Sequence, residues 1–162
     1  MGCCDVPDEA EARAITDCPR CGTRGRAVPE RTLAALLAPG VTRSEGLHRF
    51  CRELVCGVVY FAERGGAVLG RDALTVRVGL KEDAPDRPVC YCFGYSAADI
   101  EADVTATGTS SIPGIITERC RRGEDRCPET NPEGRCCLGN VRAVLREARD
   151  AAAVPDSCEG DA

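Results

Sequence analysis

The chain has 162 residues and a net charge of −5, with 29% charged residues and only 4% aromatic residues. This acidic balance argues against nucleic acid as a partner, because phosphate binding needs a basic surface. No stretch reaches the roughly 18 consecutive apolar residues that a membrane helix needs, and no basic region followed by an apolar stretch opens the sequence. We therefore expect a cytoplasmic protein without membrane insertion.

The first half of the chain predicts a small β-rich lobe. An acidic segment, residues 1–16, is expected to be a mobile tail, and the first lobe follows over residues 17–82. An apolar run at residues 58–61 predicts one strand. Apolar and polar residues alternate over 74–80, which predicts another strand with one face buried. With few large side chains, such a lobe is more easily stabilised by a bound metal than by a hydrophobic core alone.

Four cysteines of the first lobe have the spacing of a zinc site. They form two knuckles, Cys18-x2-Cys21 and Cys51-x4-Cys56. The first knuckle is the stronger signal, because Pro19 and Gly22 supply turn chemistry beside the ligands. Four thiolates fill the tetrahedral sphere of zinc, so the spacing predicts a closed, structural site rather than a catalytic one. His48 is an alternative ligand, although we favour a lone exposed histidine.

A charged segment with prolines, residues 81–88, predicts a linker to a second, helical lobe over residues 89–152. Ser96 can cap a helix that Gly108 ends. The whole chain is therefore expected to have an α+β fold, in which a small β-rich zinc lobe precedes a small helical lobe.

Two more helices are predicted in the second lobe. Ser110 or Ser111 can cap the first of them, which carries an apolar face of isoleucines. Apolar residues recur at helical spacing over 138–152, which predicts the second. Residues 153–162 are expected to be an acidic tail.

The most specific motif of the chain is Cys90-Tyr91-Cys92-Phe93-Gly94. One residue between two cysteines is too short for a redox dithiol of the Cys-x-x-Cys type, but two thiolates at this spacing can hold one iron. A 2Fe–2S cluster needs four thiolates. The other candidates lie in the segment that runs from Cys127 to the adjacent Cys136 and Cys137.

These motifs together resemble the amino-terminal domain of CopZ-type iron–sulfur metallochaperones. The resemblance covers about residues 18–145, and it includes the Cys-Pro-x-Cys-Gly knuckle and the segment around Cys51. The second lobe alone is similar to the bacterioferritin-associated ferredoxin family, a helical 2Fe–2S module. The sequence contains no Met-x-Cys-x-x-Cys copper loop, so copper delivery through such a loop is not expected.

The resemblance implies zinc in the first lobe and a 2Fe–2S cluster in the second. Its cluster ligands would be Cys90, Cys92, Cys127 and Cys137, with Cys136 as the alternative for the fourth. Five arginines lie near the third and fourth ligands in sequence, and such positive charge favours the reduced cluster. They are Arg119, Arg121, Arg122, Arg126 and Arg135.

Some cysteines remain outside these two sets. Cys3 and Cys4 are adjacent thiols on the acidic tail, and they are a candidate site for capture of a soft ion, because soft ions prefer sulfur. The alternative is that they have no role. Cys120 is expected in the core, and Cys158 lies in the polar C-terminal tail.

Three functions agree with this sequence. The first is one-electron transfer linked to the handling of copper or another soft metal, with a redox or metal-transport protein as partner. The second is a ferredoxin-like electron-transfer module that serves a reductase or an iron-storage protein. The third is a structural domain with two zinc sites that binds a protein partner. An enzyme is not expected, because the only histidine has no candidate nucleophile beside it.

Overall fold

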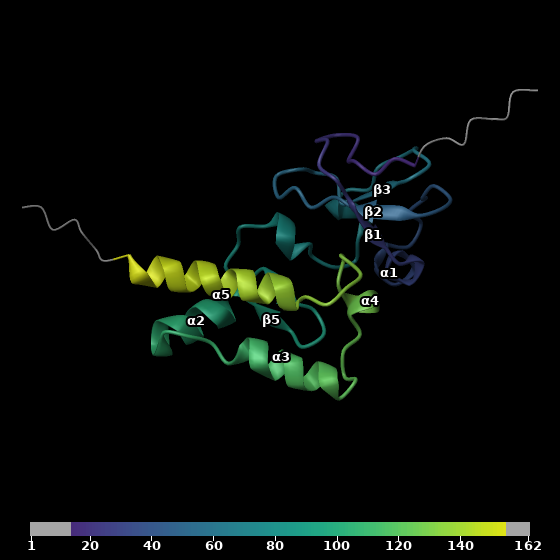
Figure 1. Ribbon diagram of the computed structural model, residues 1–162. Coiled ribbons are helices and arrows are strands. Elements are labelled where there is room, and N and C mark those ends of the chain that lie inside the picture. Colours follow the sequence, from purple (N-terminus) through teal and green to yellow (C-terminus); the bar gives the residue numbers. More distant parts are fainter. Residues whose placement is uncertain (1–13, 155–162) are drawn as a thin grey trace, which may run out of the picture.

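A three-stranded antiparallel sheet forms the centre of the first lobe in the computed structural model, which describes residues 14–154 (Figure 1). The strands follow the order β1 (Arg26–Val28), β2 (His48–Phe50) and β3 (Tyr60–Ala62). Helix α1 (Glu30–Leu36) begins directly after β1. The predicted run at 58–61 thus contributes the edge strand β3, which begins two residues later than expected.

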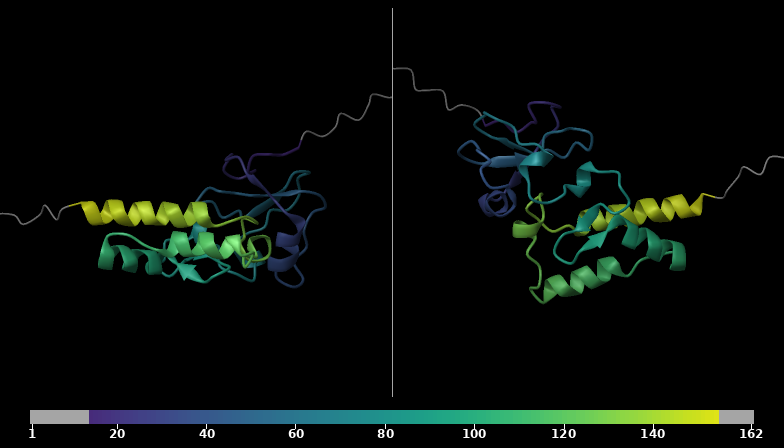
Figure 2. Two further views of the ribbon diagram at one scale, coloured as in Figure 1. Left: turned by 60° about the horizontal axis from the view of Figure 1, so that its bottom comes forward. Right: turned by 180° about the vertical axis from the view of Figure 1, so that it is seen from behind.

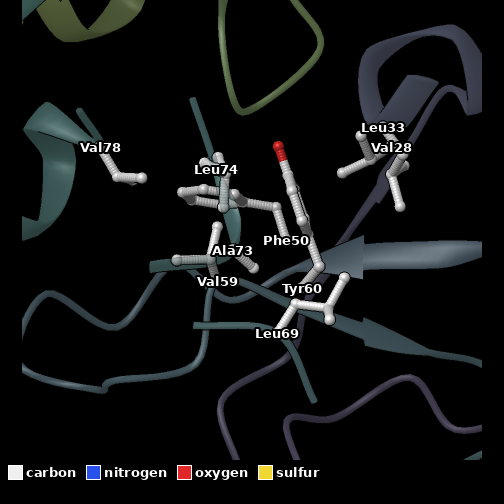
Figure 3. Close-up of a cluster of buried hydrophobic side chains, with 9 residues drawn as sticks. All are labelled: Val28, Leu33, Phe50, Val59, Tyr60, Leu69, Ala73, Leu74 and Val78. Atoms are coloured by element: carbon white, nitrogen blue, oxygen red, sulfur yellow. The ribbon is translucent and has the colours of Figure 1, made fainter. Parts of the chain in front are cut away.

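One side of this sheet carries a small hydrophobic core (Figure 3). Phe50 and Tyr60 meet edge to face, with 6.0 Å between their ring centroids, a favoured arrangement for aromatic rings. The other members are mostly small. They are Val28, Leu33, Val59, Leu69, Ala73, Leu74 and Val78. A core of this size agrees with the expectation that a bound metal contributes to the stability of the lobe.

The predicted strand over 74–80 is wrong. Leu74 forms only an isolated bridge with Leu37, and two short 3₁₀ helices, η1 (Arg71–Ala73) and η2 (Gly79–Lys81), flank the segment. The alternation of burial is real, since Leu74 and Val78 are buried and the intervening threonine and arginine are exposed. The backbone groups, however, find partners outside a ladder, because the Gly79 N–H donates to the Tyr91 hydroxyl.

Helices build the second lobe around a two-stranded hairpin of β4 (Pro88–Cys90) and β5 (Tyr95–Ser96). Helices α2 (Ala97–Thr107) and α5 (Leu138–Ala153) lie side by side, and α3 (Ile112–Arg121) packs beside α5 (Figure 2). A single-turn helix, α4 (Cys127–Thr130), was not predicted. The α+β prediction, with a β-rich lobe before a helical lobe, is confirmed.

Local sequence signals set the helix ends in the second lobe. Ser96 and Asp99 form a reciprocal capping box at the start of α2, and Gly108 ends that helix with a φ of 79°. At α3, the Ser110 hydroxyl accepts a hydrogen bond from the Ile112 N–H. Of the two serines considered for this role, Ser111 occupies the N-cap position without a side-chain hydrogen bond, and Ser110 precedes it.

The segment predicted as a linker is folded onto its surroundings. The Arg77 guanidinium donates to Glu82 and to Asp86, and the hydroxyl of Tyr91 donates to the carbonyl of Arg77. Residues 81–88 therefore connect the two lobes through hydrogen bonds rather than as a free tether.

Only part of each predicted tail is described. Of residues 14–16, Ile15 donates from its N–H to the carbonyl of Glu63, so the described chain is attached to the first lobe at that point. None of the helices in residues 14–154 has the length and apolar character that crossing a bilayer requires.

Candidate metal centres

The four cysteines predicted to bind zinc converge on one point. Their sulfur atoms all lie within 4.8 Å of one another, and they are Cys18, Cys21, Cys51 and Cys56. The Sγ atoms of Cys21 and Cys51 are 3.6 Å apart, and those of Cys18 and Cys56 are 4.0 Å apart. Such a compact thiol tetrad is the donor set that a tetrahedral zinc ion requires.

Tight turns present these sulfurs. In the first knuckle the Gly22 N–H donates to the Cys18 carbonyl, and Gly22 has a φ of 75°, a conformation that glycine adopts without strain. In the second knuckle the Cys56 N–H donates to the Glu53 carbonyl. Cys51 follows directly on β2, so the central sheet carries one side of the site.

The thiols of this tetrad differ in their environment. Cys21 is exposed, and hydrogen bonds with Thr23 lower its pKa to about 6. Burial raises the pKa of Cys51 to about 12. Because zinc binds thiolates, the exposed Cys21 is the ligand that is most readily available as an anion, whereas the buried members ionise together with metal binding.

A buried lysine supports the second knuckle. Lys81 is the only lysine of the chain, and it is only 7% exposed. Its ammonium group donates to the carbonyls of Glu53 and Cys56, at 2.7 and 3.1 Å, and lies 5.7 Å from the centre of the Phe50 ring. Its positive charge lies close to the second knuckle, and the four thiolates with a bound zinc carry a net negative charge that this ammonium group would partly balance. Sequence reasoning missed this residue, because only the fold brings it to the knuckle.

His48 is not exposed, contrary to our expectation. It lies on β2 and is 2% exposed, and its Nδ1 atom is hydrogen-bonded to the Gly46 carbonyl at 3.0 Å. It is not a member of the thiol tetrad. His48 and Phe50 lie on the same face of β2, and that face points into the protein. The sequence around this single histidine did not indicate its burial.

The second set of cysteines comes from four different elements. Cys90 ends β4, Cys92 lies in the turn before β5, Cys127 begins α4, and Cys137 precedes α5. Three of them are buried, at 0%, 3% and 1% exposure for Cys90, Cys127 and Cys137, and Cys92 is half-buried.

These sulfurs do not form a tetrad as compact as that of the first lobe. Cys92 Sγ lies 3.4 Å from Cys127 Sγ, and contact with the Cys137 thiol lowers the pKa of Cys90 to about 7. Among residues 14–154, only the first set gathers its sulfurs within 4.8 Å of one another. We expected Cys90 and Cys92 to hold one iron together, and Cys92 lies beside Cys127 of the later segment.

Burial favours Cys137 over Cys136 as the fourth ligand of the second site. Cys137 is buried against the second core, whereas Cys136 is exposed. The carbonyl of Cys137 accepts from the Val141 N–H and so opens helix α5. Cys120 is half-buried and packs against the same core, as expected. Cys3, Cys4 and Cys158 lie outside the described residues.

Most of the arginines that lie near the second set of cysteines in sequence are paired with carboxylates. Arg119 lies over the Phe93 ring, 3.9 Å from its centre, and donates to Glu124. Arg126 pairs with Glu129. The predicted positive field is therefore partly neutralised, and Arg119 is the arginine whose charge acts on the Cys90 thiol.

Two groups near Cys92 were not anticipated. The Arg126 N–H donates to its sulfur at 3.2 Å, and the Thr130 hydroxyl lies 3.2 Å from the same atom. Both groups belong to α4 or its start. The proline after Cys127 is a signal for a helix start, so this single turn was in principle readable from the sequence.

Comparisons with known proteins agree with this description. A family model for the CopZ zinc binding domain matches residues 15–75. The copper chaperone CopZ of Archaeoglobus fulgidus is 34% identical over 122 residues, which make up 74% of this chain and 57% of that protein. The chain thus spans little more than half the length of that relative.

A solved structure extends the similarity to both lobes. The X-ray structure of the Archaeoglobus fulgidus CopZ N-terminal domain superposes with a TM-score of 0.64 at 32% identity. The match covers 79% of this chain and 96% of that domain.

Proposed function

The chain belongs to the family of CopZ amino-terminal domains, and from this premise we propose that it is a metal-handling protein with two centres. In this proposal, zinc occupies the tetrad of the first lobe, and a 2Fe–2S cluster is held by Cys90, Cys92, Cys127 and Cys137 in the second. The first lobe is a zinc-binding domain of CopZ type.

The pairing of the second set of sulfurs carries the proposal of a cluster. A zinc ion draws four thiolates toward one centre, as in the first lobe, whereas a 2Fe–2S cluster has two irons and takes two thiolates on each. The sulfurs of Cys92 and Cys127 form one close pair, and Cys90 and Cys137 are both buried in the core of the second lobe. The residues present therefore fit a binuclear group better than a second zinc.

The surrounding residues suit such a group. Burial of three of the four cysteines excludes water from the site. The half-buried Cys92 lies toward the surface, and the Arg126 N–H donates to its sulfur. A hydrogen bond to a ligating sulfur stabilises added negative charge and raises a reduction potential. When bound, a 2Fe–2S cluster supplies reversible transfer of single electrons.

We further propose that this electron transfer serves the handling of copper or another soft metal in the cytoplasm, without enzymatic turnover. The name of the Archaeoglobus relative, a copper chaperone, supports this reading. A redox or metal-transport protein would be the partner.

Metal analysis tests the proposal. Protein purified without oxygen should contain zinc, iron and sulfide, and dithionite should bleach its visible bands and produce a spin-one-half signal at low temperature. A colourless protein that stays free of iron after reconstitution, with zinc at both sites, would leave the structural two-zinc domain in its place.

Addition of copper distinguishes the first two functions. Reduced protein that has been freed of dithionite should convert copper(II) to copper(I), which a copper(I)-specific chelator reports by colour. A reduced cluster that stays reduced in the presence of copper(II) would favour the ferredoxin-like module for a reductase or an iron-storage protein.

A further inference from the structure

The loop between the third and fourth cysteines of the second set is buried against the first lobe. All four of its central residues, 131–134, are buried, although the loop is rich in polar and turn-forming residues. Asn131 is 2% exposed and Glu133 is 4% exposed. We call residues 131–134 the docked loop. Its position near β1 and α1 is visible in Figure 1, where α4 lies next to α1.

Two side chains of the first lobe donate hydrogen bonds to the backbone of this region. The hydroxyl of Tyr60, on β3, donates to the Pro132 carbonyl at 2.7 Å, and both groups are buried. The hydroxyl of Thr32, on α1, donates to the Pro128 carbonyl, one residue after Cys127. Figure 3 shows the Tyr60 hydroxyl pointing out of the hydrophobic core. A buried carbonyl that loses its donor is costly, so these hydroxyls specify where the loop lies.

The docked loop also makes a close backbone approach. A Cβ atom at Gly134 would lie 2.6 Å from Pro29 Cδ and 2.8 Å from the Thr32 hydroxyl oxygen, and Gly134 has a φ of 68°. Only glycine satisfies both conditions without a shift of the loop away from α1.

A buried charge completes the contact. The Glu133 carboxylate accepts a hydrogen bond from Asn140 of α5, and its other oxygen lies 3.5 Å from the guanidinium of Arg26 on β1. Glu133 thus links the first lobe to the helix that follows Cys137, so the segment is held from both sides.

We propose that the first lobe, with Tyr60 and Thr32 as positioning residues, orders the segment that presents Cys127 and Cys137, so that zinc binding and cluster retention are coupled. The inference rests on the proposed function for the identity of the group that those two thiols bind. If the predicted linker left the two lobes independent, loss of zinc would instead leave the visible absorbance largely intact.

Hydrogen exchange of iron-free, zinc-loaded protein tests the positioning without reference to the cluster. Tyr60→Phe keeps the buried ring and removes only the donor to Pro132, and it should speed exchange of amides in 127–137 by about fivefold, the factor that one hydrogen bond of ordinary net strength represents. Amides in α2 should keep their rates.

A matched control and a second variant show whether the effect comes from the hydrogen bond to the loop. In the part of the chain that the structure describes, the Tyr95 hydroxyl has no hydrogen bond, so Tyr95→Phe should change no exchange rate in 127–137. Thr32→Val should act as Tyr60→Phe does. Unchanged exchange in both Tyr60→Phe and Thr32→Val would overturn the proposal.

Removal of zinc tests the coupling itself. In iron-free Cys21→Ser protein that has lost zinc, exchange in 127–137 should rise while α2 stays protected. In the iron-loaded form, a chelator should bleach Tyr60→Phe about fivefold faster than wild type at unchanged zinc content, for the same hydrogen-bond reason. If loop exchange is faster in these variants but the protein never binds iron, the positioning role stands and the proposed cluster is refuted. If the protein binds the cluster, but neither Tyr60→Phe nor loss of zinc changes the bleaching rate or the loop exchange, the coupling alone is refuted.

Discussion

At the residue scale, cysteines that look equivalent in the sequence differ in their chemistry because their environments in the fold differ. Cys136 and Cys137 are neighbours in sequence, yet the first is exposed and the second is packed into the core of the second lobe. Cys21 and Cys51 belong to one thiol tetrad, yet hydrogen bonds lower the pKa of one and burial raises the pKa of the other. These differences give two predictions, and the buried Lys81 gives a third.

The fourth position of the second site is expected to be Cys137. Cys137→Ser should abolish or strongly perturb the visible absorbance and the low-temperature spin signal of reconstituted protein, because a buried ligand beside Cys90 is lost. Cys136→Ser should keep both, since its sulfur faces solvent. Equal spectra for the two variants would contradict the assignment.

The reactivity of Cys21 in metal-free protein should depend on pH. Its pKa of about 6 is lower than the ordinary thiol value, so the thiolate is the minor form at pH 5 and the major form at pH 7. Alkylation by iodoacetamide should therefore rise over this interval at Cys21, while Cys51, with a pKa of about 12, stays unmodified. Peptide mass mapping reads out each site, and added zinc should protect Cys21.

Lys81 should stabilise the second knuckle. In Lys81→Met the carbonyls of Glu53 and Cys56 lose their donor in a buried place, which costs about 1–3 kcal/mol of unfolding free energy. Urea denaturation of the zinc-loaded protein measures it. Lys81→Arg keeps a charged donor and should recover part of the loss, whereas a Met variant as stable as wild type would show that the ammonium group is dispensable.

At the element scale, capping signals and apolar periodicity agree with the helices found. The Ser96 box, Gly108 and the periodic segment from residue 138 each mark a helix end or face. The strand prediction over 74–80 failed where no neighbouring strand was available to complete it, although exposed residues do separate the buried Leu74 and Val78. Periodicity reports which side chains are buried, but a strand also needs a partner.

The Ser96 cap gives the prediction at this scale. Ser96→Ala removes the acceptor for the Asp99 N–H and should cost about 1 kcal/mol, which lowers the midpoint of thermal unfolding by about 2–4 °C. Ser111 makes no side-chain cap at α3, so Ser111→Ala should leave the midpoint nearly unchanged. Equal shifts in the two variants would mean that the capping box is not what stabilises α2.

At the scale of the whole molecule, the two thiol sets lie in different lobes that are nevertheless in contact. All eight proposed ligands fall within residues 14–154. The contact runs through the docked loop, so the lobes are joined by hydrogen bonds as well as by the chain.

A chain that starts at Ala14 should therefore keep both metals. Zinc, iron and sulfide contents of the shortened protein, compared with the full chain, check this prediction. Loss of either metal would show that the first thirteen residues, which include Cys3 and Cys4, supply a ligand. Soft-metal titration of the same pair of proteins measures whether those two cysteines capture copper(I) or mercury(II).

The sequence by itself determined the members of the zinc tetrad, the α+β order of the lobes and the helix caps. Ligand spacing, turn residues and capping residues are local, and they can be read without knowledge of neighbours in space. Only the tertiary structure decided that Cys137 rather than Cys136 is buried, that His48 is inside, that Lys81 reaches the second knuckle and that Tyr60 holds the loop before Cys137. Each of these depends on which segments pack together, and contacts between residues far apart in sequence leave no periodic or spacing signal in the chain.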